Sequence, residues 1–88
     1  MPPADLLLML RAQPFIPFRI YLDDGTVYEI RHPELVLLSV ASAIIAFPDP
    51  ERPGLNRSWE IVALRHMVRL ERIEPAGQAT EPGAASAP

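Results

Sequence analysis

Prolines divide this chain into short segments and so limit the elements that it can form. Eleven of the 88 residues are Pro, and eight of them lie before residue 54. Because proline lacks a backbone N–H and fixes φ, it is excluded from helix interiors and from central strands. The longest uncharged apolar run, residues 35–47, has thirteen residues. A membrane-spanning helix needs about 20, so we expect this run to lie in a soluble core and predict no membrane contact.

Composition excludes several classes of protein. The apolar fraction of 49% is too high for a wholly disordered chain, and the absence of Cys rules out disulfides, thiolate metal sites and a cysteine nucleophile. All eight positive charges are Arg, and they face eleven acidic residues, for a net charge of -3. This balance supplies no general attraction for phosphate and argues against a strongly basic nucleic-acid binder.

The chain divides near Pro75. Ten of the fourteen residues from 75 to 88 are Pro, Ala or Gly, a composition that predicts a disordered tail. We therefore expect a single domain over residues 4–74. Residues 1–5 carry no basic side chain and the apolar run at 6–10 is too short for a secretory signal, which favours the cytoplasm.

A short helix is expected at about residues 4–12. Leu6, Met9 and Leu10 fall at helical spacing and make one apolar face. We expect this face to pack on the domain's own core rather than on a partner. Pro14 disfavours helical backbone at Gln13 and so ends the helix.

Strands are expected in six later runs, at about 18–22, 26–31, 35–40, 43–47, 58–64 and 68–73. The loop Asp23-Asp24-Gly25 decides the register of the first two. A two-residue loop would pair Ile20 with Glu29 and bury a carboxylate. A three-residue loop pairs Ile20 with Tyr28 and sets Arg19 opposite Glu29 on the outer face, so we predict this register, with Gly25 in the left-handed region.

The runs at 35–40 and 43–47 are almost wholly apolar and predict a second hairpin buried on both faces. Trp59 is expected to be a core or rim aromatic. So short a chain is not expected to make two full sheets. The fold class predicted is therefore mainly β: a small five-stranded, strongly bent barrel of the Sm-like or SH3-like kind, with a short N-terminal α-helix.

Two resemblances support this prediction. The order of helix, Asp-Gly hairpin, bent strand, short hairpin and tight turn into a last strand resembles the Sm-like small barrel of Sm proteins and the bacterial RNA chaperone Hfq. The motifs at 13–20, 24–25, 28–34 and 66–71 (QPFIPFRI, DG, YEIRHPE and HMVRLE) also resemble a group of small uncharacterised bacterial proteins. That second resemblance covers most of residues 6–74 and implies no activity.

The Sm resemblance implies RNA bound near two loops that face the pore of a ring. One loop carries an Asn in Sm proteins, and the matching stretch here, residues 34–39, has none. The other falls at Arg65 and His66, where a basic pair suits phosphate. Arg65, His66 and His32 are therefore the candidate contacts for RNA or for a protein partner.

No constellation predicts catalysis, a cofactor or a metal. His32 and His66 have no neighbouring His or Cys, and metal binding needs three or four converging ligands. Asp23 and Asp24 are explained by the turn that they form with Gly25. We therefore expect a non-enzymatic small-barrel protein that works through protein association, either self-assembly into a homo-oligomer or docking to a partner. RNA binding by an Sm-like ring is the alternative, disfavoured by net charge.

Overall fold

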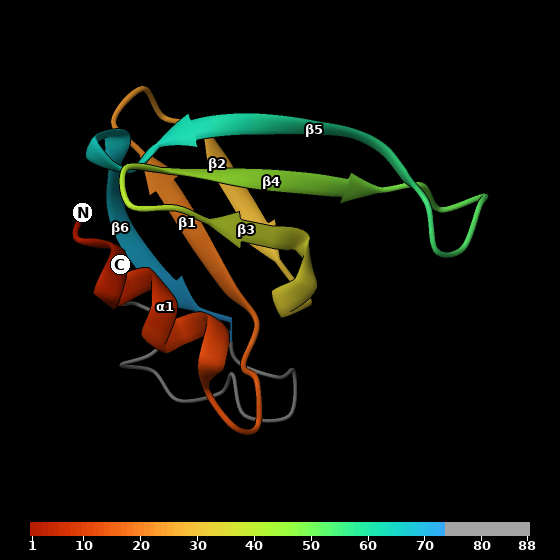
Figure 1. Cartoon of the computed structure of the whole chain (residues 1–88), viewed down its shortest axis with the longest axis horizontal. Helices are drawn as coiled ribbons and strands as arrows, with labels where there is room; N and C mark the ends of the chain where they lie inside the picture. The colour runs from red at the N-terminus through yellow and green to blue at the C-terminus, as the bar shows by residue number, and fades with distance from the viewer. Residues whose placement is uncertain (74–88) are drawn as a thin grey trace.

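A computed structural model describes residues 1–73, and the expected tail lies outside the described residues. Residues 1–73 form one α-helix, six strands and two single 3-10 turns (Figure 1). In chain order these are α1 (Pro3–Arg11), β1 (Phe18–Leu22), β2 (Val27–Ile30), η1 (Pro33–Leu35), β3 (Val36–Leu38), β4 (Ser42–Pro48), β5 (Asn56–Ala63), η2 (Leu64–His66) and β6 (Met67–Arg72).

The strands form two three-stranded antiparallel sheets, in the orders β2-β1-β6 and β3-β4-β5. A mainly β fold with a short N-terminal helix is thus confirmed. The expectation that so short a chain could not make two sheets was wrong. The strands are short, with three to eight residues each, as predicted for the small barrel. They divide into two small sheets because the turn η1 separates β2 from β3.

The register of the first hairpin is confirmed. Ile20 pairs with Tyr28, and Arg19 pairs with Glu29. The loop between the strands closes with the Leu22 N–H donating to the Thr26 carbonyl at 2.8 Å. Gly25 has a φ of +91°, a conformation that glycine adopts without the steric cost of a Cβ.

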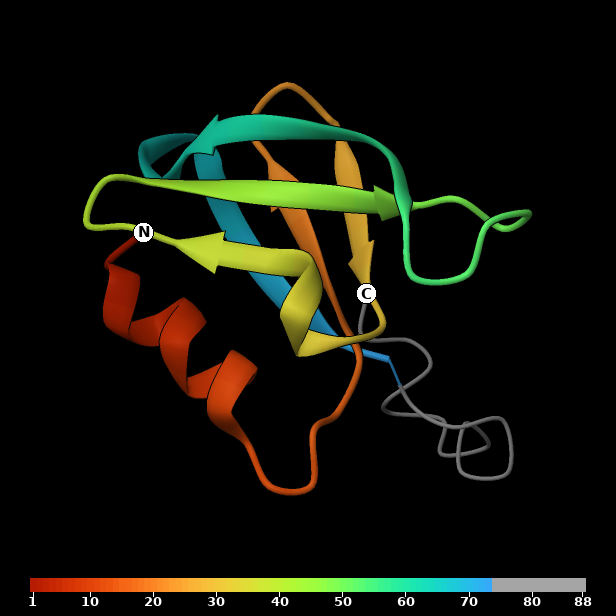
Figure 2. The same ribbon diagram turned by 45° about the vertical axis from the view of Figure 1, so that its right-hand side comes forward.

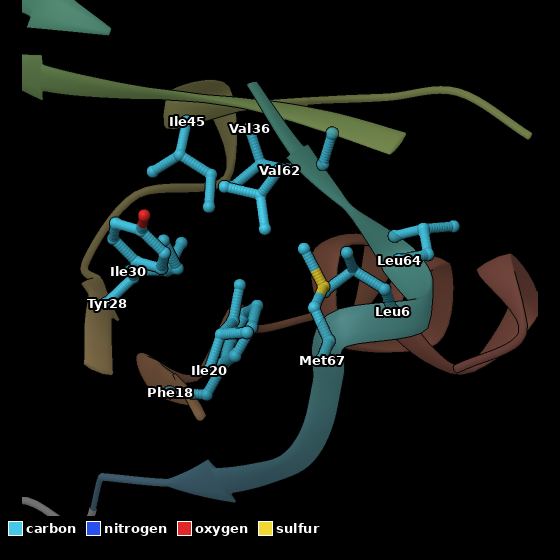
Figure 3. Close-up of a cluster of buried hydrophobic side chains, with 11 residues drawn as sticks. Leu6, Phe18, Ile20, Tyr28, Ile30, Val36, Ile45, Val62, Leu64 and Met67 are labelled. Carbon is cyan, nitrogen blue, oxygen red and sulfur yellow. The ribbon is translucent and has the colours of Figure 1, made fainter. Parts of the chain in front are cut away.

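The core lies between the two sheets and is completed by the helix (Figure 3). Phe18 and Ile20 of β1 are fully buried, and so is Leu6 of α1. The helix contacts β3 and lies across one end of the two sheets (Figures 1 and 2). Its apolar face therefore packs on the domain itself, as expected. Among the described residues, no helix is long and apolar enough to cross a membrane.

The hairpin of β3 and β4 is buried on one face only. Val36 and Ile45, which oppose each other, point into the core. Leu37 points the other way and is 65% exposed. The expectation of burial on both faces was wrong because no element in residues 1–73 covers the outer side of this sheet (Figure 2).

Leu6→Ala tests the contribution of the helix to the core. Leu6 is fully buried, and truncating a buried Leu to Ala costs about 2–5 kcal/mol. We expect this loss in the free energy of unfolding measured by urea denaturation. Leu8→Ala is the matched control on the same helix, since Leu8 is 73% exposed. Equal losses in the two variants would contradict the packing of α1 described above.

Candidate functional site

Arg65 and His66 lie on η2, the turn that joins β5 to β6, and both side chains are exposed. His66 Nδ1 lies 2.9 Å from Asp23 Oδ2, and the Asp23 N–H donates to the His66 carbonyl at 2.9 Å. The structure therefore brings together two features that are far apart in the sequence, the basic pair and the acidic turn. The basic pair sits beside the carboxylates of Asp23 and Asp24 rather than in a cationic patch.

A cleft of about 340 Å³ lies between the β1–β2 turn and the end of β5. Its polar side chains are Asp23, Asp24, His66 and Tyr28, and the rest of its lining is hydrocarbon: Leu22, Ile61, Val62 and Ala63. The Asp24 carboxylate accepts a hydrogen bond from the Thr26 N–H at 2.9 Å, which lowers its pKa. Among residues 1–73, no Ser, Thr, Cys or Lys lines this cleft, so no hydroxyl, thiol or amine nucleophile of those types stands beside His66.

Tyr28 links the two sheets beside the cleft. Its hydroxyl donates to Glu60 Oε1 at 2.5 Å, joining β2 to β5. Burial raises the pKa of Tyr28 to about 12, and the hydrogen bond to Glu60 and its negative charge add to this. The Tyr28 proton therefore stays in place over the whole physiological range, and Tyr28 acts as a structural clamp.

His32 lies elsewhere, at the start of η1. It lines a depression of about 250 Å³ together with Glu34 and residues of the loop that follows β4. This depression and the cleft at His66 share no residue. His32, Glu34 and His66 therefore do not converge. Within residues 1–73, no three His, Cys, Asp or Glu side chains are grouped closely enough to hold a metal ion.

The outer face of the β2-β1-β6 sheet is covered by ion pairs. Arg19 lies 3.6 Å from Glu29 and 3.4 Å from Glu71, and Arg69 lies 3.1 Å from Glu71. The Tyr21 hydroxyl donates to Glu71 at 2.5 Å, which lowers the pKa of that carboxyl. Charged groups paired in this way remain at the surface. Val27 is an exposed apolar side chain beside them on this face, and it is less exposed than Leu37, Trp59 or Ile61 of the other sheet.

The outer face of the β3-β4-β5 sheet is apolar. Leu37 pairs with Ile44, and Ile44 pairs with Ile61. Trp59 lies two pairs further along β5 and so on the same side of the sheet. Leu37, Trp59 and Ile61 are 65%, 60% and 63% exposed. We call Leu37, Ile44, Trp59 and Ile61 together the apolar face. Contiguous exposed apolar surface of this kind marks interaction sites in soluble proteins.

The sequence pointed to Arg65, His66 and His32 and missed the apolar face. Trp59 was expected to be a core or rim aromatic, and it lies in mid-strand with most of its surface exposed. A signal was present: both faces of β4 are apolar, yet residues 1–73 contain only one helix to cover them. That helix already closes the core, so one sheet face had to remain open.

Comparison with protein-family models, with curated proteins and with solved structures finds no match to this chain.

Tyr28 gives the clamp a pH dependence that can be measured. Its pKa is raised from 10.0 to about 12 in the folded protein, so between these values the unfolded chain releases the proton first. The stabilisation is complete below about pH 10 and is lost as the pH rises through about 12. We expect the free energy of unfolding of Tyr28→Phe to fall less steeply than that of the parent over this range.

The contribution of Glu60 to the raised pKa of Tyr28 can be measured with two carboxylate variants. Glu60→Gln removes the negative charge beside Tyr28, and we expect the tyrosinate absorbance of this variant to appear at lower pH than in the parent. Both variants are made in a Tyr21→Phe background, because the chain has two Tyr and Glu71 raises the pKa of Tyr21. In that background Glu71→Gln is the matched control, since the partner of Glu71 is Tyr21 and not Tyr28. An identical titration of Tyr28 in the parent and in Glu60→Gln would show that the clamp is not formed.

Proposed function

We propose that this protein is a non-enzymatic association module that binds a protein surface, either a further copy of itself or a partner, through the apolar face. The observation that carries the proposal is the contrast between the two sheets. The outer face of β2-β1-β6 is covered by paired charges, whereas that of β3-β4-β5 exposes Leu37, Trp59 and Ile61. Burying such side chains contributes roughly 1.5–3 kcal/mol each for residues of this size.

We further propose that the two sheets are a small barrel of the Sm-like or SH3-like kind that is open between β2 and β5. Three features support this assignment. A helix precedes the strands, the first hairpin turns at Gly25, and the 3-10 turn η2 leads directly into the last strand. The Tyr28–Glu60 hydrogen bond then bridges the open side. The likeness of motifs such as 28–34 to small bacterial proteins is consistent with this assignment and adds no activity to it.

RNA binding is the alternative, and the surroundings of the basic pair argue against it. His66 is engaged by Asp23, and Asp24 lies in the same cleft. Phosphate brought to this turn would meet two carboxylates beside one Arg and one His. Contacts with phosphate are strongest at low salt, so an RNA oligomer that is shifted at low salt by the parent and not by Arg65→Ser would favour the alternative.

Ile61→Ser tests the proposal directly. If Ile61 is buried on association, its removal loses roughly 1.5–3 kcal/mol, which weakens binding about tenfold to one-hundredfold. We expect this change in the dissociation constant measured by sedimentation velocity over a range of concentrations. Leu55→Ser is the matched control, because Leu55 is 59% exposed in the loop before β5 and lies outside the apolar face.

Two outcomes would contradict the proposal. One is a parent protein that stays monomeric at every concentration and binds no hydrophobic dye. The other is a dissociation constant that changes equally in Ile61→Ser and Leu55→Ser, because the apolar face would then contribute nothing specific.

A further inference from the structure

The free edge of β5 carries backbone groups without partners in residues 1–73. β5 is the last strand of its sheet and pairs only with β4. The Leu64 N–H donates to the Ala41 carbonyl at 2.9 Å, which marks these two as a hydrogen-bonded pair. Hydrogen-bonded pairs alternate along an antiparallel ladder. The N–H and C=O of Val62 and Glu60 therefore face β4, and those of Ile61 and Trp59 point outward.

The other free edges are shorter than β5. β3 has three residues and β2 has four, and β6 carries Arg69, Glu71 and Arg72 among its six. β5 has eight residues and no proline. Its two charged side chains are both engaged, Arg57 over the ring of Phe47 and Glu60 with Tyr28. Long edges without charges or prolines are templates for pairing with another strand.

We propose that two copies of this chain pair through β5, antiparallel, with a two-fold axis at Trp59. This inference rests on the proposed function and names the partner as a second copy. Among the free edges of residues 1–73, only another β5 is as long as β5 itself. A two-fold contact is self-complementary and closes, so it makes a dimer and not a fibre.

The register follows from symmetry and charge. In an antiparallel pair, residues directly opposite each other lie on the same face of the sheet. The two-fold axis must therefore pass midway between one residue and its own copy in the second chain. An axis at Glu60 would place two Glu60 carboxylates directly opposite each other, which is unfavourable. An axis at Ser58 would set Ile61 against Leu55, which lies outside the strand. An axis at Ile61 would centre the partner strand on the cleft beside Asp23 and Asp24. This register is less favourable, because the middle of the second strand would then lie against these two carboxylates.

With the axis at Trp59, each contact is favourable or neutral. Trp59 faces Trp59 of the second copy, and Ser58 faces Glu60. Ile61 falls opposite Arg57, where β5 departs from regular pairing with β4, so the regular part of the new ladder runs from Ser58 to Glu60 of each copy. The two β3-β4-β5 sheets become one six-stranded sheet, and the apolar faces of both copies join into one surface. Aromatic cross-strand pairs add to the stability of such a ladder.

Engineered cysteines test the register, since the chain has no Cys of its own. Ser58 and Glu60 of opposite copies would form a non-hydrogen-bonded pair with Cα atoms about 4.5 Å apart, within the range of a disulfide. Two Ser58 or two Glu60 would lie diagonally, about 7–8 Å apart. We expect a mixture of Ser58→Cys and Glu60→Cys under mild oxidation to give mainly the mixed disulfide by mass spectrometry.

Proline tests the role of the backbone. The Trp59 N–H points away from β4, so Trp59→Pro is tolerated at this edge but blocks pairing with a second strand. Trp59→Ala is the matched control, because it removes the same indole and keeps the N–H. We expect both variants to keep the parent circular dichroism spectrum, and the dimer dissociation constant of Trp59→Pro to exceed that of Trp59→Ala at least tenfold.

The outcomes separate this inference from the proposed function. Association without the mixed disulfide, or a dominant Glu60→Cys homodimer, overturns pairing at Trp59 and leaves association standing. Equal dissociation constants for the proline and alanine variants also overturn it. A strictly monomeric parent that binds a hydrophobic dye overturns the dimer alone, and one that binds no dye overturns both.

Discussion

The structure depends on the register of β1, the central strand of its sheet. Phe18 and Ile20 are fully buried, and they face Ile30 and Tyr28 across the hairpin. Because side chains alternate along a strand, a slip of one residue would bring Arg19 into the core. The three-residue loop ending at Gly25 prevents that slip. The same register places Arg19 beside Glu29 and Glu71 on the outside, so the core and the charged face are set together.

The shortage of covering elements explains the other sheet. A domain of about 70 residues buries only about 60% of the surface of its unfolded chain. Its single helix inserts Leu6 between the sheets, and among residues 1–73 nothing remains to cover the outer side of β3-β4-β5. Trp59 and Ile61 are left exposed on a strand whose backbone edge is also free. Pairing through β5 would cover the edge, whereas the side chains of the apolar face would be covered only by a protein surface packed against the sheet.

Local patterns predicted much of the fold. The helix ends at Arg11, the first strand spans Phe18–Leu22, and the tight connection at Arg65 and His66 is a 3-10 turn, each within a residue or so of its expected place. These features follow from capping, alternation and turn preference within a few residues of chain. The division into two sheets did not follow from them, because it depends on how η1 turns β2 away from β3.

The candidate site shows the same division between sequence and structure. By itself, the sequence determined the residue types available: a basic pair at 65–66, an acidic turn at 23–24 and apolar residues on both sides of β4. Only the tertiary structure decided that His66 meets Asp23, 43 positions away in the chain, and that Leu37, Trp59 and Ile61 face solvent. Alternation tells which residues share a face, whereas the exposure of that face depends on what packs against it.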